Sequence, residues 1–231
     1  MEEFLKIHTI KNTDPQPKQP KKLHPFFKEN LPMPFTALIV SRKGAGKTTI
    51  ICNIIHKFYR KMFDRIVYIS PTALNDRTLC HVRSDDSIEI VTEYSDDLIL
   101  NIVDNVEKDP AERENILIVL DDVTGAVPQR AEIFKLFTRI RHLNISILFV
   151  VHKFNTYIPT MVRLNVNAVI LLKGLTNKEA KFIADEYSHV TEGDEEKFLE
   201  AYDYATKDKF NFLFVNLEDN KLFKNFQEEI M

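Results

Sequence analysis

Residues 41–49 read Ser-Arg-Lys-Gly-Ala-Gly-Lys-Thr-Thr, and this loop decides the fold class of the chain. It follows an apolar run at 35–40 and leads into a helical pattern from residue 50. A strand, a glycine-rich loop and a helix in this order form the context of a phosphate-binding loop. The glycines let the backbone curl so that successive N–H groups point at phosphate oxygens, and the helix adds the positive end of its dipole. The stretch therefore predicts a site for a nucleoside triphosphate.

The residue types in this loop assign individual roles. We expect Lys47 to reach the β- and γ-phosphates and the Thr48 hydroxyl to coordinate Mg²⁺. The usual pattern GxxxxGK[ST] begins with glycine, but here its first position is Ser41, so the loop is a variant. The alternative, a chance Gly-rich turn, does not explain the strand and helix on either side. The residues expected to bind the nucleotide are Ser41, Arg42, Lys43, Gly44, Ala45, Gly46, Lys47, Thr48 and Thr49.

A second motif, roughly 70 residues downstream, points to hydrolysis. Residues 116–122 read Ile-Leu-Ile-Val-Leu-Asp-Asp, an apolar run that ends in two carboxylates. A run without polar alternation predicts a central parallel strand, and ligands bind at the carboxyl ends of such strands. We expect Asp121 to hold Mg²⁺ opposite Thr48, and Asp122 to polarise the attacking water. The alternative is that Asp122 only caps the following turn.

Length and composition bound the class of protein. A chain of 231 residues, 44% hydrophobic and 28% charged, is ordinary for one soluble α/β domain. No run reaches the roughly 18 apolar residues of a membrane span, and no signal peptide opens the chain. The two cysteines, Cys52 and Cys80, lack metal-binding spacing, and a reducing interior such as cytoplasm fits them. A net charge of −3, with the excess of acid at 176–231, excludes a strongly basic protein that coats nucleic acid.

The pattern along the chain predicts alternating strands and helices. Residues 11–34 are rich in proline and predict an extended arm, and Phe4 to Ile10 predict a short strand before it. Phe26 and Phe27 favour docking of the arm on a neighbouring subunit or on another protein, because adjacent exposed aromatic side chains tend to become buried. The alternative is a flexible tail. We expect strands at 35–40, 65–70, 88–92, 116–121, 145–151, 168–172 and 211–216, and helices at 48–62, 95–107, 129–142, near 158–163, at 176–187 and at 193–205. Residues 71–87 are polar and predict an irregular insertion. The alternation predicts a doubly wound, mostly parallel sheet.

The tip of the strand at 145–151 supplies a third candidate, His152. In phosphate-loop enzymes with an extra strand between the loop strand and the metal-carboxylate strand, this tip lies beside the γ-phosphate. We expect His152 to sense hydrolysis there; the alternative is that it only caps the strand.

A charge-offsetting arginine is the remaining part of a phosphoryl-transfer site. Arg163 is the first candidate to reach the nucleotide of a neighbouring subunit, with a structural role as the alternative. Arg139 and Arg141 are rivals. A further alternative is that Arg42 and Lys43 act on the nucleotide of their own subunit.

These motifs together resemble the poxvirus-type genome-packaging ATPases of the FtsK–HerA superfamily, which large DNA viruses, virophages and related internal-membrane viruses make. The resemblance covers roughly residues 31–187. Its discriminating part is the polar-tipped strand followed by Pro-x-x-x-Arg-x-Asn at 159–165; the lead Leu31-Pro-Met-Pro-Phe and Ser70-Pro71-Thr72 are also similar. Two positions depart from the family, which usually has Gln where this chain has His152 and Gly where it has Ser41.

The resemblance implies an additional-strand P-loop ATPase domain at 35–231 that follows an arm at 1–34. It also implies a homo-oligomeric ring, a pentamer or hexamer, in which ATP and Mg²⁺ drive double-stranded DNA into a capsid. Viral capsid or inner-membrane components are then partners, and the virion and the host cytoplasm with its virus factory are the expected locations. The main alternative is an ATP-dependent switch or scaffold that moves no DNA. A small-molecule kinase ranks last, because 71–94 supplies only Arg77 and Arg83 for a lid.

Overall fold

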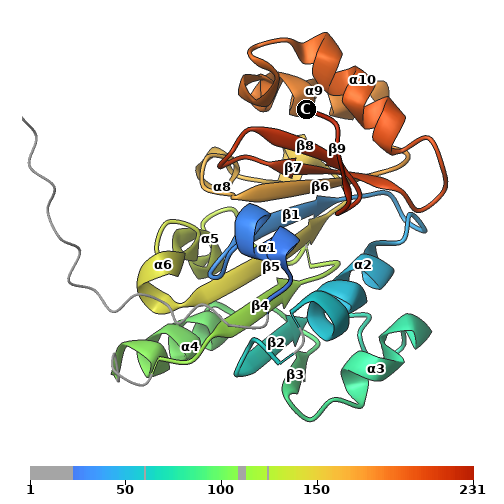
Figure 1. The fold of residues 1–231 in the computed structure, drawn as a ribbon. Helices are drawn as coiled ribbons and strands as arrows, with labels where there is room; N and C mark the ends of the chain where they lie inside the picture. Colours follow the sequence, from blue (N-terminus) through green and yellow to red (C-terminus); the bar gives the residue numbers. More distant parts are fainter. Residues whose placement is uncertain (1–22, 60, 109–112, 124) are drawn as a thin grey trace, which may run out of the picture.

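One nine-stranded sheet organises the chain (Figure 1). The computed structural model describes residues 23–59, 61–108, 113–123 and 125–231. The predicted strand at Phe4 to Ile10 lies outside the described residues, as does the arm up to residue 22. The strands are β1 Thr36–Val40, β2 Arg65–Ile69, β3 Ile88–Val91, β4 Ile116–Leu120, β5 Ile145–Val151, β6 Ala168–Leu172, β7 Phe212–Asn216, β8 Lys221–Lys224 and β9 Glu228–Glu229.

The strand order is β3-β2-β4-β5-β1-β6-β7-β8-β9. The strands from β3 to β6 pair in parallel, whereas β7, β8 and β9 extend the sheet in antiparallel fashion. The expected additional strand is therefore confirmed, because β5 lies between the phosphate-loop strand β1 and the double-aspartate strand β4. The mostly parallel sheet is confirmed as well.

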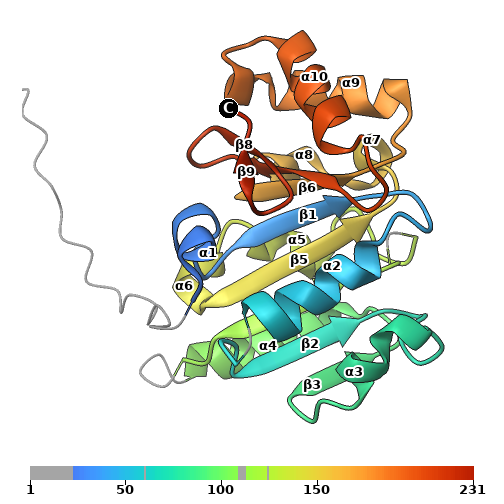
Figure 2. The same ribbon diagram turned by 45° about the vertical axis from the view of Figure 1, so that its right-hand side comes forward.

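Helices cover both faces of the sheet, as a doubly wound fold requires (Figure 2). They are α1 Pro25–Asn30, α2 Lys47–Asn53, α3 Cys80–Arg83, α4 Asp96–Lys108, α5 Glu132–Leu136, α6 Ile140–Leu143, α7 Phe154–Tyr157, α8 Thr160–Arg163, α9 Asn177–Glu186 and α10 Glu195–Ala205. A π-helical segment, Ile54–Phe58, continues α2. The predicted caps form, since the Ser95 Oγ accepts from the Leu98 N–H (3.1 Å) and the Thr176 Oγ1 from the Glu179 N–H (3.1 Å).

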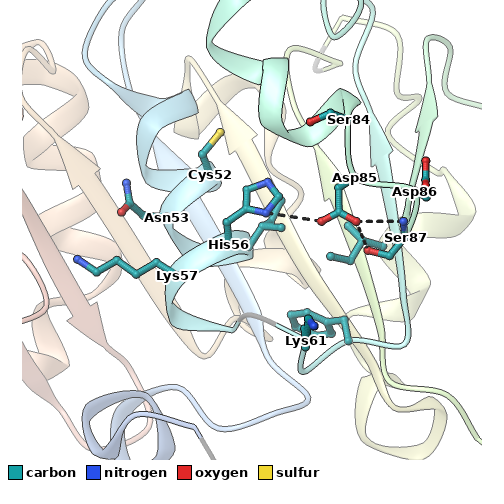
Figure 3. Close-up of a pocket in the computed structure, with 12 residues that line it drawn as sticks. Cys52, Asn53, His56, Lys57, Lys61, Ser84, Asp85, Asp86 and Ser87 are labelled. Carbon is teal, nitrogen blue, oxygen red and sulfur yellow. Dashed lines mark hydrogen bonds and ion pairs between the residues drawn. The ribbon is translucent and has the colours of Figure 1, made fainter.

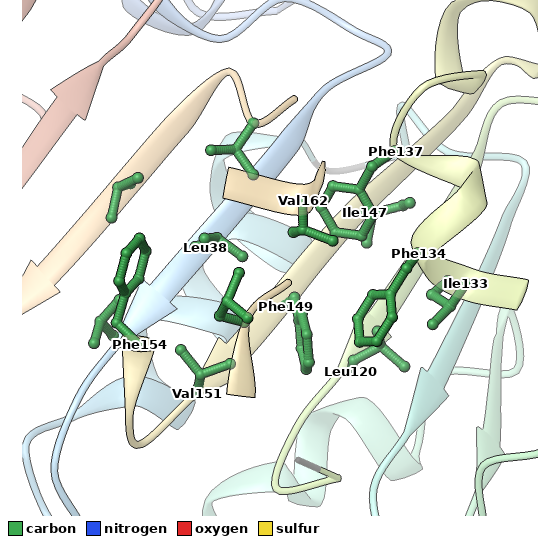
Figure 4. Close-up of a cluster of buried hydrophobic side chains, with 14 of the residues drawn as sticks. Leu38, Leu120, Ile133, Phe134, Phe137, Ile147, Phe149, Val151, Phe154 and Val162 are labelled. Atoms are coloured by element: carbon green, nitrogen blue, oxygen red, sulfur yellow. The ribbon is translucent and has the colours of Figure 1, made fainter. Parts of the chain in front are cut away.

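Alternate residues of each central strand enter two separate cores. In β1, Leu38 and Val40 pack on the side of α4 to α10, whereas Ala37 and Ile39 pack on the side of α1 and α2. Figure 4 shows the first of these cores, in which Phe149 and Phe134 fill the space between sheet and helices. Both faces of β1, β4 and β5 are buried, as is typical of central parallel strands.

Two local predictions are wrong. The extended conformation expected for 11–34 fails at α1, because Pro25 stands at the first helical turn, where its missing N–H costs nothing. The helix expected at 129–142 is split, since the Thr138 hydroxyl bonds back to the Lys135 carbonyl (2.9 Å) and Arg139 leaves the helical region. The short helix expected near 158–163 is confirmed as α8, and Pro159 separates it from α7, which the sequence did not predict.

The described part of the arm packs on the domain that follows it. Phe27 is 1% exposed, and its ring lies 4.6 Å from the Phe58 ring and 5.3 Å from that of Tyr59, centroid to centroid. The Tyr59 hydroxyl donates to the Leu31 carbonyl (2.5 Å). Within the described residues, no helix is both long and apolar enough to cross a membrane.

Candidate nucleotide-binding site

The carboxyl ends of β1, β5, β4 and β2 meet at one edge of the sheet. The Ser41 N–H, just after β1, donates to the Val151 carbonyl (3.0 Å), and the Asp121 N–H, just after β4, donates to the Ile69 carbonyl (3.0 Å). These bonds align the loops that follow the four strands. The phosphate loop, both aspartates and His152 therefore come together where open α/β sheets bind ligands.

The phosphate loop has the curled backbone that the sequence predicted. Gly44 (φ +78°) and Gly46 (φ +100°) both occupy left-handed conformations that side chains with a Cβ rarely adopt. Arg42, Lys43, Gly44 and Thr49 are exposed, so the loop opens to solvent. Ser41 is fully buried, and no described residue bonds to its hydroxyl.

Lys47 lies between the two aspartates. Its Nζ is 3.1 Å from the Asp121 Oδ1 and also forms a close ion pair with the Asp122 Oδ1. The lysine side chain is 11% exposed, and that of Asp121 is 2% exposed. The three charges that the sequence predicted to act on one nucleotide are thus in contact.

A buried tyrosine that the sequence analysis did not single out is hydrogen-bonded to Asp121. The hydroxyl of the buried Tyr68 in β2 donates to the Asp121 Oδ2 (2.9 Å). Burial raises the pKa of Asp121 above its usual value, although Lys47 and the Tyr68 hydroxyl oppose that rise. The buried Asp121 Oδ1 has the Lys47 ion pair but no hydrogen-bond partner among the described residues. A carboxylate oxygen with spare acceptor capacity beside the Thr48 loop fits a Mg²⁺ ligand.

Asp122 faces the loop from a strained backbone. Its φ of +58° is unusual for a residue other than glycine and turns the chain sharply after β4. Burial raises its pKa, but the Lys47 ammonium and the His152 ring outweigh burial, so the pKa lies below its usual value. Asp122 is therefore a carboxylate at neutral pH, as a group that accepts a proton from water must be.

His152 joins the same cluster from the tip of β5. Its Nε2 lies 2.6 Å from the Asp122 Oδ1, and its Nδ1 lies 2.8 Å from the Ser41 carbonyl oxygen. Both of these oxygens accept, so the ring satisfies both when each nitrogen carries a proton. The strand tip thus connects Asp122 to the start of the phosphate loop.

Asp76 is a second residue that sequence reasoning missed. It follows β2 within the segment expected to be irregular, which instead contains a 3₁₀ turn and α3. The Thr48 Oγ1 lies 3.5 Å from the Asp76 Oδ2, while the Asp76 Oδ1 accepts from the Thr78 N–H (2.8 Å). Its position after a parallel strand next to β4 was the only available signal.

The cluster opens into a cavity of about 590 Å³. Lys43, Gly44, Gly46, Lys47, Thr48, Thr49, Thr72, Asp76, Thr78, Asp122, His152 and Phe210 line it. A larger cavity of about 850 Å³ lies elsewhere, between α2 and the segment before β3 (Figure 3). There His56 faces Asp85 (Nδ1 to Oδ2, 3.7 Å), and no residue of 41–49 lines it.

The candidate arginines lie outside the cluster, and each has a partner in its own subunit. The Arg163 Nε is 2.9 Å from the Glu186 Oε2, and its Nη1 donates to the Ile158 carbonyl (2.7 Å). Arg139 pairs with Glu107 of α4, and Arg141 with Glu218 (2.8 Å). Arg163 therefore makes the local bonds that a purely structural role would require. Its action on a neighbouring subunit stays a prediction. Arg42 and Lys43 point to solvent at the loop itself.

Solved structures with known nucleotide sites share this fold. The chain is similar to the genome packaging NTPase B204 from Sulfolobus turreted icosahedral virus 2 in complex with ATPγS, at 13% identity and a TM-score of 0.59, covering 81% of this chain and 94% of that one. The DNA-packaging ATPase B204 from Sulfolobus turreted icosahedral virus matches at 16% identity and 0.58, covering 82% and 96%. The conjugation coupling protein TcpA of pCW3, with ATPγS, matches at 15% and 0.55, covering 79% and 57%.

These likenesses establish the P-loop NTPase fold. No curated protein matches the chain in sequence. A family model does match, that of the Poxvirus A32 protein, and it spans residues 24–217, from the cap of α1 to the end of β7. The model thus includes the phosphate loop, the double aspartate and the strand tip with His152. On this match and this fold, the chain belongs to the poxvirus A32 family.

Proposed function

We propose that this chain is an ATPase that moves double-stranded DNA into a viral capsid. Membership of the poxvirus A32 family supports the proposal, as does the likeness to the two B204 proteins, a genome packaging NTPase and a DNA-packaging ATPase. The observation that carries it is the contact of Lys47 with both aspartates, completed by His152 at the tip of β5. This combination provides a cation for phosphates, a metal ligand and a carboxylate base within one cluster.

Each residue of the cluster has its own role in hydrolysis. Lys47 exchanges its contact with Asp122 for the β- and γ-phosphates, which frees that carboxylate to orient and deprotonate the attacking water. Thr48 and Asp121 hold Mg²⁺, which offsets phosphate charge when it is bound. His152 keeps its bond to the Ser41 carbonyl and reports on the occupancy of the γ-phosphate position through Asp122.

The assembly is part of the proposal. Arginines act in the site of a neighbouring subunit only in an oligomer, so we propose a homo-oligomeric ring of five or six subunits around the DNA. Arg163, Arg139 and Arg141 are the candidates for that role. Capsid or inner-membrane components anchor the ring, and the virion and the cytoplasmic virus factory are its locations.

The test is ATP hydrolysis by wild type and Lys47→Ala, each with and without long double-stranded DNA. We expect hydrolysis that rises with DNA in the wild type and falls by at least about 10²-fold in Lys47→Ala. Lys178→Ala, which removes an exposed lysine of α9, is the control and keeps the wild-type rate. Wild-type hydrolysis that ignores DNA would instead support the assembly switch, which the near-neutral charge of the chain favours. Equal rates for wild type and Lys47→Ala would remove the assigned site altogether.

The arginine role needs a separate test by subunit mixing. An Arg163→Ala subunit and a Lys47→Ala subunit are each expected to be inactive alone. If Arg163 acts across the interface, a mixture regains activity, because an intact Lys47 site then meets an intact Arg163 in some neighbours. A mixture as inactive as its components assigns Arg163 to its contacts with Glu186 and Ile158.

A further inference from the structure

Phe210 lies against the phosphate loop from a distant part of the chain. It belongs to the loop between α10 and β7, which runs beside the loop joining β1 to α2 in both views (Figures 1 and 2). A Cβ built on Gly46 would lie 3.1 Å from the Phe210 Cδ1. The edge of the ring therefore touches the loop directly before Lys47.

Burial does not account for the position of this ring. Phe210 is 57% exposed, whereas Phe212, two residues later, is 7% exposed and belongs to an aromatic cluster. The Phe210 backbone also has a φ of +70°, a conformation that is costly for an aromatic residue. An exposed aromatic side chain in a strained backbone beside a binding loop indicates a functional contact.

A groove begins where the phosphate cavity ends. It has a volume of about 650 Å³, and it shares Thr49 and Phe210 with the phosphate cavity. Aromatic side chains form part of its wall, among them Phe58 and Phe226, and amides form another part. The amide residues that line it are Asn53, Asn211, Asn225 and Gln227.

This lining matches the chemistry of a nucleobase. A base has two apolar faces, which stack on aromatic rings, and a polar edge, which bonds to amides. The first turn of α2 connects the two cavities, because Lys47 lines the phosphate cavity and Thr49 lines both. A nucleotide held by its phosphates at Lys47 therefore directs its sugar and base past Thr49 toward Phe210.

We propose that Phe210 is the stacking surface for the base of the nucleotide, and that Asn211, Asn225 and Gln227 surround the edge of that base. The inference rests on the proposed nucleotide binding at residues 41–49 and adds the subsite that distinguishes a nucleotide from a bare polyphosphate. Aromatic stacking tolerates any base, so the amides are the groups that select among bases.

The experiment compares two probes, ATPγS and inorganic tripolyphosphate, by calorimetric titration in buffer with Mg²⁺. The variants are Phe210→Ala, which removes the ring, and Phe210→Tyr, which keeps it. We expect Phe210→Ala to weaken ATPγS binding about 5- to 100-fold while tripolyphosphate binding stays the same. Phe210→Tyr should bind both probes as the wild type does. Because Phe210 is largely exposed, its removal should leave thermal unfolding unchanged.

The outcomes separate this inference from the proposed function. If the wild type binds both probes and Phe210→Ala keeps its ATPγS affinity, the stacking role is wrong and the phosphate site stands. If Phe210→Ala weakens both probes equally, the ring supports the loop and not the base, which also overturns the inference. If the wild type binds neither probe, nucleotide binding itself fails, and the base site fails with it.

Discussion

Replacing Tyr68 by phenylalanine tests whether Asp121 is held as a buried, charged carboxylate. Tyr68 is fully buried, Asp121 is 1% exposed, and the hydroxyl donates to the Asp121 Oδ2 at 2.9 Å. The substitution removes one oxygen and keeps the ring, so it creates almost no cavity. A buried hydrogen bond to a charged group contributes about 1.5–3 kcal/mol to the free energy of unfolding. For a domain of this size, each kcal/mol corresponds to about 2–4 °C in Tm, so we expect Tm to fall by about 3–12 °C.

The pH dependence of this loss has a definite sign. Burial already raises the pKa of Asp121, and the Tyr68 hydroxyl opposes the rise, so Tyr68→Phe raises that pKa further. An acidic group whose pKa is raised in the folded protein binds more protons in the folded state than in the unfolded state. Its contribution to the free energy of unfolding therefore falls as the pH rises through its pKa in the folded protein. The variant should therefore lose most stability near pH 8, and the loss should shrink as the pH is lowered and Asp121 becomes neutral.

The assay is urea unfolding of the wild type and variants at about pH 8 and about pH 5. Tyr59→Phe is the matched control, because Tyr59 is equally buried but its hydroxyl donates to the neutral Leu31 carbonyl. The control should lose about 0.5–1.5 kcal/mol at both pH values. A Tyr68→Phe variant within about 0.5 kcal/mol of the wild type at pH 8 would refute the reasoning. So would a loss that grows as the pH is lowered.

Other substitutions test the remaining parts of the molecule. Phe27→Ala should lower the free energy of unfolding by about 3–5 kcal/mol in urea, because it empties a fully buried position; a loss below about 1 kcal/mol would mean that the arm is not part of the core. Burial raises the pKa of Cys52 to about 11, so at pH 8 a maleimide should label the exposed Cys80 first; a fast phase that survives Cys80→Ser would contradict this. His152→Gln should keep ATP turnover within about tenfold because an amide still bonds to Asp122, whereas His152→Leu should lose about 10²-fold or more; equal losses would rule out the hydrogen-bonding role. Asp122→Asn should abolish hydrolysis. It also leaves Lys47 with one ionic partner fewer, so ATPγS should bind more tightly; weaker binding would argue against competition between Asp122 and the phosphates for Lys47.

Local patterns predicted which residues meet at the candidate site, and their chemical roles stay predictions. The phosphate loop and the double aspartate each lie within fewer than about ten consecutive residues, so their geometry follows from a strand that ends in a turn. The uninterrupted apolar run of β4 predicted a buried parallel strand, and the structure buries every residue of β4 and of its neighbour β5. Lys47, Asp121, Asp122 and His152 come together because parallel strands end at the same edge.

Features that depend on tertiary contacts gave no comparable signal. Asp76 reaches Thr48 only because the segment after β2 folds back in a 3₁₀ turn, and its neighbours in sequence are polar. Phe210 follows Asp208 and Lys209 in a stretch that reads as an ordinary surface turn. The strand β8 buries only Leu222 and Phe223, too short a run to distinguish from a loop.

The helix α1 shows how one residue supports opposite interpretations. Proline-rich sequence predicts extended chain, but Pro25 follows His24, whose Nδ1 accepts from the Phe26 N–H (3.2 Å) and caps the helix. Proline at the first turn starts a helix as readily as it ends one. The burial of Phe27 against Phe58 and Tyr59 favours the helix, because it offsets the entropy cost of ordering the segment.

The charge arrangement of the site explains how one cluster serves both binding and hydrolysis. Without a nucleotide, two adjacent carboxylates repel each other, and the depressed pKa of Asp122 depends on Lys47 and His152 lying beside it. Phosphates compete for the same lysine, because it has a single ammonium group and negative charge on two sides of it. Occupancy of the phosphate site therefore removes a cation from Asp122, and a carboxylate that loses a neighbouring cation becomes a stronger base. In the proposed mechanism, the ligand thus strengthens the base that assists its own hydrolysis, while the Tyr68 hydroxyl donates to Asp121 from the buried side of the site.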